Sequence, residues 1–102
     1  MLTLRYRFDW DPHKASLNAQ KHTISFRQAA TVFRDPRHLS IYDEEHSEDE
    51  DRWITLGIAG KGILLVVVHT FEQMDEENVS VRIISARKAT VSEIAEYGQV
   101  NQ

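Results

Sequence analysis

The chain has no cysteine among its 102 residues, which excludes disulfide bonds and thiolate metal ligands. It also has no long hydrophobic run, because the longest stretch, Ile63–Val68, has only six residues. The first seven residues lack the apolar core of a signal peptide. We therefore expect a soluble cytoplasmic protein without a membrane contact. The five histidines and the acids show no recognised metal-ligand spacing, so we expect no metal ion and no cofactor.

The chain also lacks an excess of basic residues, with 12 Lys and Arg against 16 Asp and Glu. The formal net charge is −4 at pH 7, which is unusual for a protein that binds nucleic acid. The charges are segregated, however: residues 1–42 carry a net charge of +4, whereas residues 43–51 hold seven acids and no lysine or arginine. This distribution permits one surface that faces anions and another that faces cations. The acidic run fits equally well a solvated loop and a docking site for a basic partner.

The chain does contain a regular succession of strand and helix signals, with no internal repeat or low-complexity linker. Its length predicts one domain over residues 1–102. The patterns predict, in order, a strand over residues 2–8, a helix from 12 to about 22, a short helix from 25 to about 35, strands over 39–42, 53–58, 63–69 and from about 81, and a helix from 90 to about 98. Residues 72–78 form a polar connection. The predicted fold is α+β, with a small, mainly antiparallel sheet, two N-terminal helices and one C-terminal helix.

The segment from Val81 to Thr90 is the most informative part of this pattern. An apolar strand contains Arg82 and ends in Arg87 and Lys88, just before the helix cap at Thr90. Strict alternation of side chains places Arg82 and Arg87 on opposite faces of the strand. Because an unpaired buried guanidinium is costly, Arg82 either pairs with a carboxylate of a neighbouring strand or faces an anionic ligand.

Several short motifs lie along the chain in a specific order and spacing. They are Phe8–Lys14, Asn18 with Lys21-His22, Ser25-Phe26 with Ala29-Ala30 and Val32-Phe33, Asp35-Pro36, Glu50–Trp53 with Gly57, Val66–Thr70, and Arg82–Thr90. Together they resemble toxins of the BrnT type, over about residues 8–97. The resemblance implies a RelE-like fold and a bacterial type II toxin, a ribonuclease that cleaves RNA and arrests growth. It also implies neutralisation by a BrnA-type antitoxin whose ribbon-helix-helix domain binds operator DNA, so that this chain reaches operator DNA only through the antitoxin.

RNA cleavage without a metal needs a base for the 2'-hydroxyl, an acid for the leaving 5'-oxygen and fixed positive charge around the phosphate. The chain offers candidates for each role. Arg82, Arg87 and Lys21 are candidates to hold phosphate, His22 and His69 to act as acid or base, Glu50 to act as base, and Arg52 to pair with Glu50 or reach phosphate.

Several of these residues, and Asn18, also have a plainer explanation. His69 ends a very apolar strand, where a hydrogen-bonded core histidine is the commoner case. Lys21 fits the solvated face of an amphipathic helix, and Glu50 with Arg52 fits a surface ion pair of little energetic weight. Asn18 fits a helix-surface amide or a group that orients a neighbouring strand end.

One position departs from the family pattern. After His69 and Thr70 the family commonly has an aromatic or small residue followed by arginine, but here Phe71 is followed by Glu72 and more acids. A negative charge in that place repels an RNA phosphate. Three interpretations stay open: an active ribonuclease, a catalytically weak or inactive module that serves mainly as antitoxin partner and operon co-repressor, and an α+β domain without either role.

Overall fold

A computed structural model of the protein describes residues 4–101, and the predicted start of the first strand at residues 2–3 lies outside them. The strands are β1 (Arg5–Asp9), β2 (Leu39–Tyr42), β3 (Trp53–Ile58), β4 (Leu64–His69), β5 (Glu72–Gln73) and β6 (Asn78–Lys88). The helices are α1 (Pro12–His22), α2 (Phe26–Ala30) and α3 (Val91–Val100), with short 3-10 helices η1 (Thr31–Arg34) and η2 (Glu44–His46). None of the helices within residues 4–101 has the length and apolar character needed to cross a membrane.

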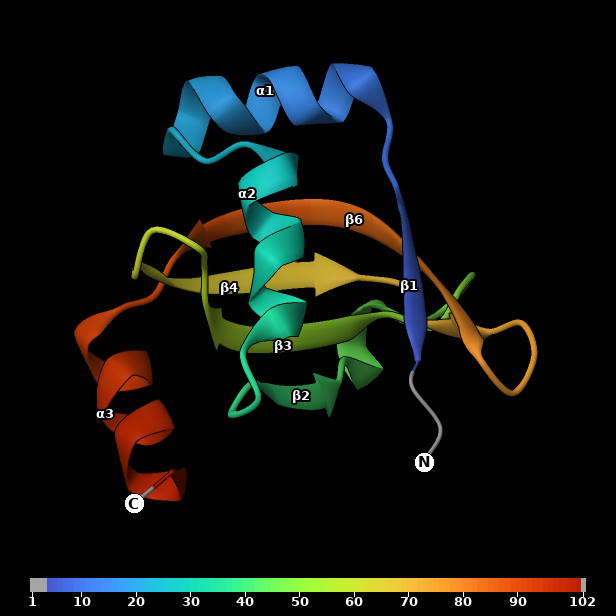
Figure 1. Ribbon diagram of the computed structural model, residues 1–102. Helices are drawn as coiled ribbons and strands as arrows, with labels where there is room; N and C mark the ends of the chain where they lie inside the picture. Colours follow the sequence, from blue (N-terminus) through green and yellow to red (C-terminus); the bar gives the residue numbers. More distant parts are fainter. Residues whose placement is uncertain (1–3, 102) are drawn as a thin grey trace.

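The strands form one sheet in the order β1-β6-β4-β3-β2 (Figure 1). The short strand β5 pairs with β6. β1 pairs with β6 in parallel, whereas the other strand pairs are antiparallel. The predicted α+β class is confirmed, but the sheet is mixed, which corrects the expectation of a mainly antiparallel sheet. The long connection between β1 and β6 permits the parallel direction. The segment predicted as a polar connection contributes the short strand β5.

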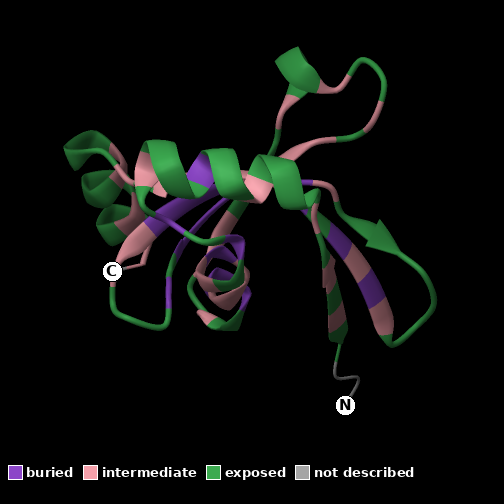
Figure 2. Cartoon of the chain, turned by 90° about the horizontal axis from the view of Figure 1, so that it is seen from above, coloured by how far each residue is buried: buried purple, intermediate pink, exposed green. Residues whose placement is uncertain are grey.

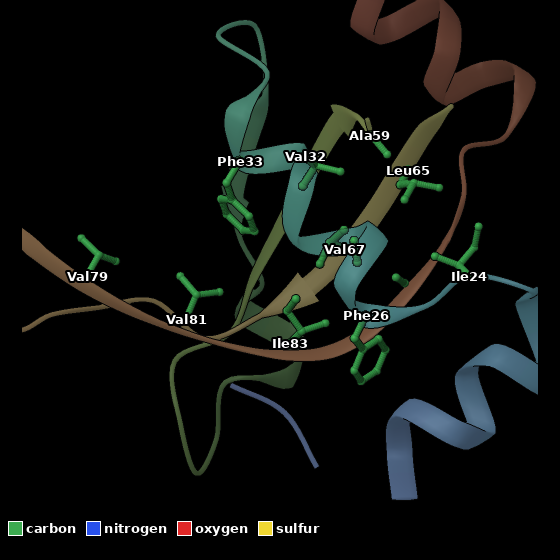
Figure 3. Packing of buried hydrophobic residues seen from close by; sticks show 12 residues of the cluster. Ile24, Phe26, Val32, Phe33, Ala59, Leu65, Val67, Val79, Val81 and Ile83 are labelled. Carbon is green, nitrogen blue, oxygen red and sulfur yellow. The ribbon is translucent and has the colours of Figure 1, made fainter. Parts of the chain in front are cut away.

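The core lies between the sheet and the segment formed by α2 and η1, which crosses β6, β4 and β3 (Figure 1). Phe26, Val32 and Phe33 of this segment point toward side chains of β4 and β6 (Figure 3). The buried residues gather in the strands and in this segment, while α1 and α3 are exposed along most of their length (Figure 2). The predicted second helix is therefore an α-helical turn that continues as a 3-10 helix. It ends at Asp35, whose backbone is extended because Pro36 follows.

The side chain of Asn18 completes the edge of β6 where β1 ends. Its Nδ2 donates to the backbone oxygen of Ala86 at 2.9 Å, and its Oδ1 accepts from the backbone nitrogen of the same residue at 3.0 Å. The same Nδ2 also donates to the oxygen of Ile24 at 3.0 Å. Asn18 is buried, so these bonds satisfy amide groups that have no access to water. Of the two predicted roles for Asn18, the structure has the one that orients a strand end.

A β-bulge in β6 changes the predicted direction of its arginines. Val68 of β4 pairs with Ser85, but the next residue, His69, pairs with Ile83, so Ile84 is an extra residue in β6. Ile83 and Ala86 are consequently both buried on the helix-covered face. Arg82 and Arg87 therefore lie on the same, opposite face of the sheet. The prediction that Arg82 and Arg87 lie on opposite faces was wrong. It assumed strict alternation, and the apolar pattern of the sequence does not reveal a bulge.

Helix α3 begins at a complete capping box, as predicted. The Thr90 side chain accepts from the backbone nitrogen of Glu93, and the Glu93 carboxylate accepts from the backbone nitrogen of Thr90. The helix continues two residues past its predicted end at Gly98. Among the described glycines only Gly62, in the hairpin between β3 and β4, has a positive φ, of 82°. Gly98 therefore does not adopt the left-handed conformation that ends many helices.

Candidate active site

Three predicted site residues come together where the acidic loop meets the middle of β6. The guanidinium of Arg82 contacts the carboxylate of Glu50 directly. The other oxygen of that carboxylate lies 3.7 Å from Nη2 of Arg52. The Arg82 side chain is 46% exposed and that of Glu50 is 35% exposed. Solvent screens such a pair, so it contributes little to folding stability and is free to exchange partners.

Arg82 lies in an open pocket of about 390 Å³, called here the Arg82 pocket, which is lined by Glu50, Asp51, Thr70, Phe71, Glu72 and Arg82. The backbone of Arg82 is held by Thr70: Arg82 N donates to Thr70 Oγ1 at 3.0 Å, and Thr70 N donates to the oxygen of Arg82 at 2.9 Å. These bonds fix the base of the arginine and leave its guanidinium on the pocket side. Glu72, the residue that departs from the family pattern, lines the same pocket, so its charge acts on any anion that enters.

The guanidinium of Arg52 is incompletely bonded. Its Nε is buried and has no hydrogen-bond partner within residues 4–101. Its Nη2 is too far from Glu50, at 3.7 Å, for a hydrogen bond. The strand β3 directly follows Arg52, and the Arg52 backbone nitrogen donates to Ser47 Oγ at 3.0 Å. Nε is out of reach of solvent, so Nη2, on a side chain that is 31% exposed, is the donor that fits an anionic ligand.

His69 lies in the core and outside the Arg82 pocket. It is 1% exposed. Its Nδ1 is 2.8 Å from the backbone oxygen of Thr70, and its Nε2 is 2.6 Å from Thr55 Oγ1, which is 2.7 Å from Ser40 Oγ. Because a carbonyl only accepts, Nδ1 carries the proton, and Nε2 accepts from the Thr55 hydroxyl. Burial lowers the pKa of His69, so this neutral form is favoured.

Arg87 has a structural partner. It makes two parallel hydrogen bonds, of 2.8 and 2.9 Å, to the carboxylate of Glu93 in the first turn of α3. The Arg87 guanidinium lowers the pKa of Glu93 to about 2, and the pair in turn raises the pKa of Arg87. Five residues of strand, or roughly 16 Å, separate Arg87 from Arg82 along β6. Arg87 therefore fastens α3 to the sheet and lies outside the Arg82 pocket.

Lys21 and His22 lie at the end of α1, one turn beyond Asn18. Since Asn18 bonds to Ala86, this end of the helix accompanies the last part of β6, while Arg82 is in the middle of the strand. Neither Lys21 nor His22 lines the Arg82 pocket. The structure thus brings Glu50, Arg52 and Arg82 together and places Lys21, His22, His69 and Arg87 elsewhere.

Two groups near the site were missed in the sequence. His46 lines a hollow of about 410 Å³ together with Glu50 and Arg52, and its Nδ1 is 3.0 Å from Asp43 Oδ2. The second group is an aromatic pocket, of about 260 Å³, lined by Tyr6, Phe33, His38, Ser40, Trp53, His69 and Phe71. His46 was overlooked because it is embedded in an acidic run. The aromatic pocket joins residues from five separate segments, so no local pattern indicates it.

Comparison with known proteins decides the family. The sequence model of the ribonuclease toxin BrnT of type II toxin-antitoxin systems matches residues 10–93, which is most of the chain. The chain belongs to the BrnT family. The resemblance drawn from the motifs is confirmed, and membership of the BrnT family implies an antitoxin as partner.

A crystal structure agrees in fold with this member of the BrnT family. The ribonuclease toxin BrnT of Brucella abortus is 21% identical, with a TM-score of 0.50, and the alignment covers 88% of this chain and 99% of that chain. At this identity the likeness concerns the arrangement of helices and strands. No curated protein sequence matches the chain.

Proposed function

We propose that this chain cleaves RNA without a metal ion, at the cluster of Glu50, Arg52 and Arg82. The observation that carries the proposal is a carboxylate set between two guanidinium groups at an open pocket. A base and fixed positive charge at one place are the components that cleavage by the 2'-hydroxyl requires. In this proposal the chain acts as a single RelE-like domain in the bacterial cytoplasm.

The phosphate enters by exchange with Glu50. Its oxygens take the donors of Arg82 and the Nη2 of Arg52, and the displaced Glu50 carboxylate accepts the proton of the neighbouring 2'-hydroxyl. The 2'-oxygen then attacks phosphorus and the 5'-oxygen leaves, which gives a 2',3'-cyclic phosphate and a 5'-hydroxyl. The departing oxygen takes a proton from a general acid. His46 is our candidate for this acid, because it shares a hollow with Glu50 and Arg52.

The partner proposed for this toxin is a BrnA-type antitoxin with a ribbon-helix-helix domain. The toxin reaches operator DNA only through that antitoxin, because its own charge of −4 offers little to a DNA backbone. Co-expression with a neighbouring reading frame of this type restores growth if the proposal holds. Growth arrest that persists despite tight binding of that product contradicts the role of antitoxin.

The test of cleavage uses purified protein and a labelled RNA in the presence of EDTA. Replacing Arg82 by alanine lowers the cleavage rate by at least about tenfold, because the phosphate loses its main donor. Arg27→Ala is the matched control, since it removes one exposed arginine of α2 outside the Arg82 pocket. Complete loss of activity in EDTA contradicts the metal-free mechanism, and an undiminished rate for Arg82→Ala contradicts the site.

A second candidate function has its own observation in support. The Glu50 carboxylate already forms an ion pair with the Arg82 guanidinium. Glu72 adds a further negative charge to the same pocket. Both features favour a catalytically weak or inactive module that acts mainly as antitoxin partner and operon co-repressor. Expression without an antitoxin separates the two functions. Growth arrest that Arg82→Ala relieves supports the ribonuclease, and harmless accumulation of folded protein supports the binding module.

A further inference from the structure

The aromatic pocket, with Phe33 and His69 on the helix-covered face, meets the Arg82 pocket of the opposite face at Phe71, which is a wall of both. We infer that the aromatic pocket holds one nucleobase of a single-stranded RNA whose neighbouring phosphate lies on Arg82. The inference rests on the proposed function and deepens it, because it assigns a site for the base as well as for the phosphate.

The rings around this pocket suit the face of a base. Trp53 and Phe71 lie with their ring centroids 6.5 Å apart, and Tyr6, Phe33 and His69 complete the aromatic lining. Phe71 is 37% exposed, so a base from outside can reach it. Aromatic side chains bind unstacked bases by stacking, and this contact is available only where the RNA is single-stranded.

The size of the pocket limits its occupant. Its volume of about 260 Å³ is below the range of roughly 300–1,000 Å³ that is usual for sites of drug-sized ligands. A single ring system therefore fits better than a whole nucleotide. In this inference the sugar remains outside the pocket and passes Phe71 beyond the end of β4, so that its phosphate reaches the Arg82 pocket, which Phe71 also lines.

One polar group of the pocket is free to select among bases. His38 Nδ1 lies 2.7 Å from the backbone oxygen of Asp35 and therefore donates its proton there. The Nε2 of neutral His38 is then an acceptor, and it has no hydrogen-bond partner within residues 4–101. His69 differs, because both its nitrogens are engaged. His38 thus favours a base that presents an N–H group on its edge.

The test uses fluorescence anisotropy with a labelled oligonucleotide of 2'-O-methyl nucleotides, which cannot be cleaved through a 2'-hydroxyl. A second oligonucleotide has the same backbone and abasic sites. Replacing Phe71 by alanine weakens binding of the first by about tenfold, because a stacking contact is lost, and leaves binding of the second unchanged. Arg82→Ala weakens binding of both. Leu17→Ala, which truncates an exposed apolar residue of α1, changes neither.

A second readout uses His38→Gln, which alters the relative affinities for oligonucleotides of different bases but leaves affinity for the abasic strand unchanged. Equal effects of Phe71→Ala on both strands, or none, overturn the base pocket. If Arg82-dependent cleavage persists in that case, the proposed function stands alone. Absence of Arg82-dependent binding overturns both proposals. If Phe71→Ala weakens only capture of the antitoxin, the pocket holds an antitoxin side chain and the inference is overturned.

Discussion

The two arginines of β6 lie on the same face of the sheet, and each is paired with a carboxylate, yet the two pairs differ in kind. Arg87 makes two parallel bonds to Glu93, whose carboxylate also caps α3. Arg82 meets Glu50, which belongs to a loop, through one nitrogen, and the pair borders an open pocket. The carboxylate of Glu93 thus holds Arg87 in place, whereas the carboxylate of Glu50 occupies the position that we propose for the phosphate. Glu93 differs from Glu50 in two ways: its carboxylate makes more hydrogen bonds, and it does not border the Arg82 pocket.

The largest expected effect comes from Glu50→Gln, which removes the proposed base and keeps the size of the side chain. We expect the cleavage rate to fall by about 100-fold, as for loss of a general base. Binding of the 2'-O-methyl oligonucleotide should at the same time become tighter, because Arg82 loses its competing carboxylate. Rate measurements at saturating RNA and anisotropy titrations check the two parts. A parallel fall in rate and affinity contradicts the exchange between Glu50 and phosphate.

Substitutions of His46 in the acidic loop and of Lys21 and His22 at the end of α1 should affect cleavage to different extents. His46→Ala should lower the cleavage rate by about tenfold if His46 is the general acid. His22→Ala and Lys21→Ala should leave the rate within about twofold, because α1 ends beside Ala86, away from the pocket, and a remote exposed charge is screened. Single-turnover rates in EDTA check this order. A larger loss for His22→Ala than for His46→Ala reverses our assignment.

Loss of the ion pair between Arg87 and Glu93 should lower the free energy of unfolding and leave the cleavage rate unchanged. Glu93→Gln keeps a side chain that is able to cap α3 but removes the charge, so we expect a loss of about 1 kcal/mol in the free energy of unfolding, since the pair is partly exposed and screened. Urea titration measures this loss. Glu96→Gln, on an exposed position of the same helix, is the control. An unchanged stability, with a rate reduced as in Glu50→Gln, would place Glu93 in the active site.

At acid pH the wild type and Glu93→Gln should have the same free energy of unfolding. The Arg87 guanidinium lowers the pKa of Glu93 from its ordinary value of 4.5 to about 2. A carboxyl group with a lowered pKa stabilises the folded state above its ordinary pKa, and this contribution is lost as the pH falls toward the pKa of the folded state. The stability advantage of the wild type should therefore be full above pH 4.5 and vanish near pH 2. Urea titrations over this range check it, and an advantage that is independent of pH contradicts the ion pair.

Local signals in the sequence predicted most of the elements. The caps at Asp11, Ser25 and Thr90 and the break before Pro36 mark helix ends through bonds between near neighbours, so they are visible in the chain. The direction of β1 is different, because it depends on a partner strand that begins 73 residues after Arg5, at Asn78. The bulge at Ile84 is equally hidden, since an apolar residue there fits a regular strand as well.

The residues of the candidate site were predictable from the sequence, but their arrangement in space was not. Glu50, Arg52 and Arg82 were expected from family motifs and chemistry, and their meeting depends on how the acidic loop folds back on β6. The aromatic pocket was not predictable, because Tyr6, His38 and Phe71 come from strands and loops far apart in the chain. For His69 the spacing allowed a catalyst or a core residue, and the hydroxyls of Thr55 and Ser40 that bond to it lie on other strands.

The cleavage rates of Arg82→Ala and Arg87→Ala, measured side by side on one RNA in EDTA, show whether the Arg82 pocket is the active site. The two variants remove the same type of side chain from the same face of the same strand. We predict a loss of at least about tenfold for Arg82→Ala and a change within about threefold for Arg87→Ala, because of these two arginines Arg82 alone is proposed to donate to the phosphate. Equal losses, or a larger loss for Arg87→Ala, would contradict the assignment of the active site to the Arg82 pocket.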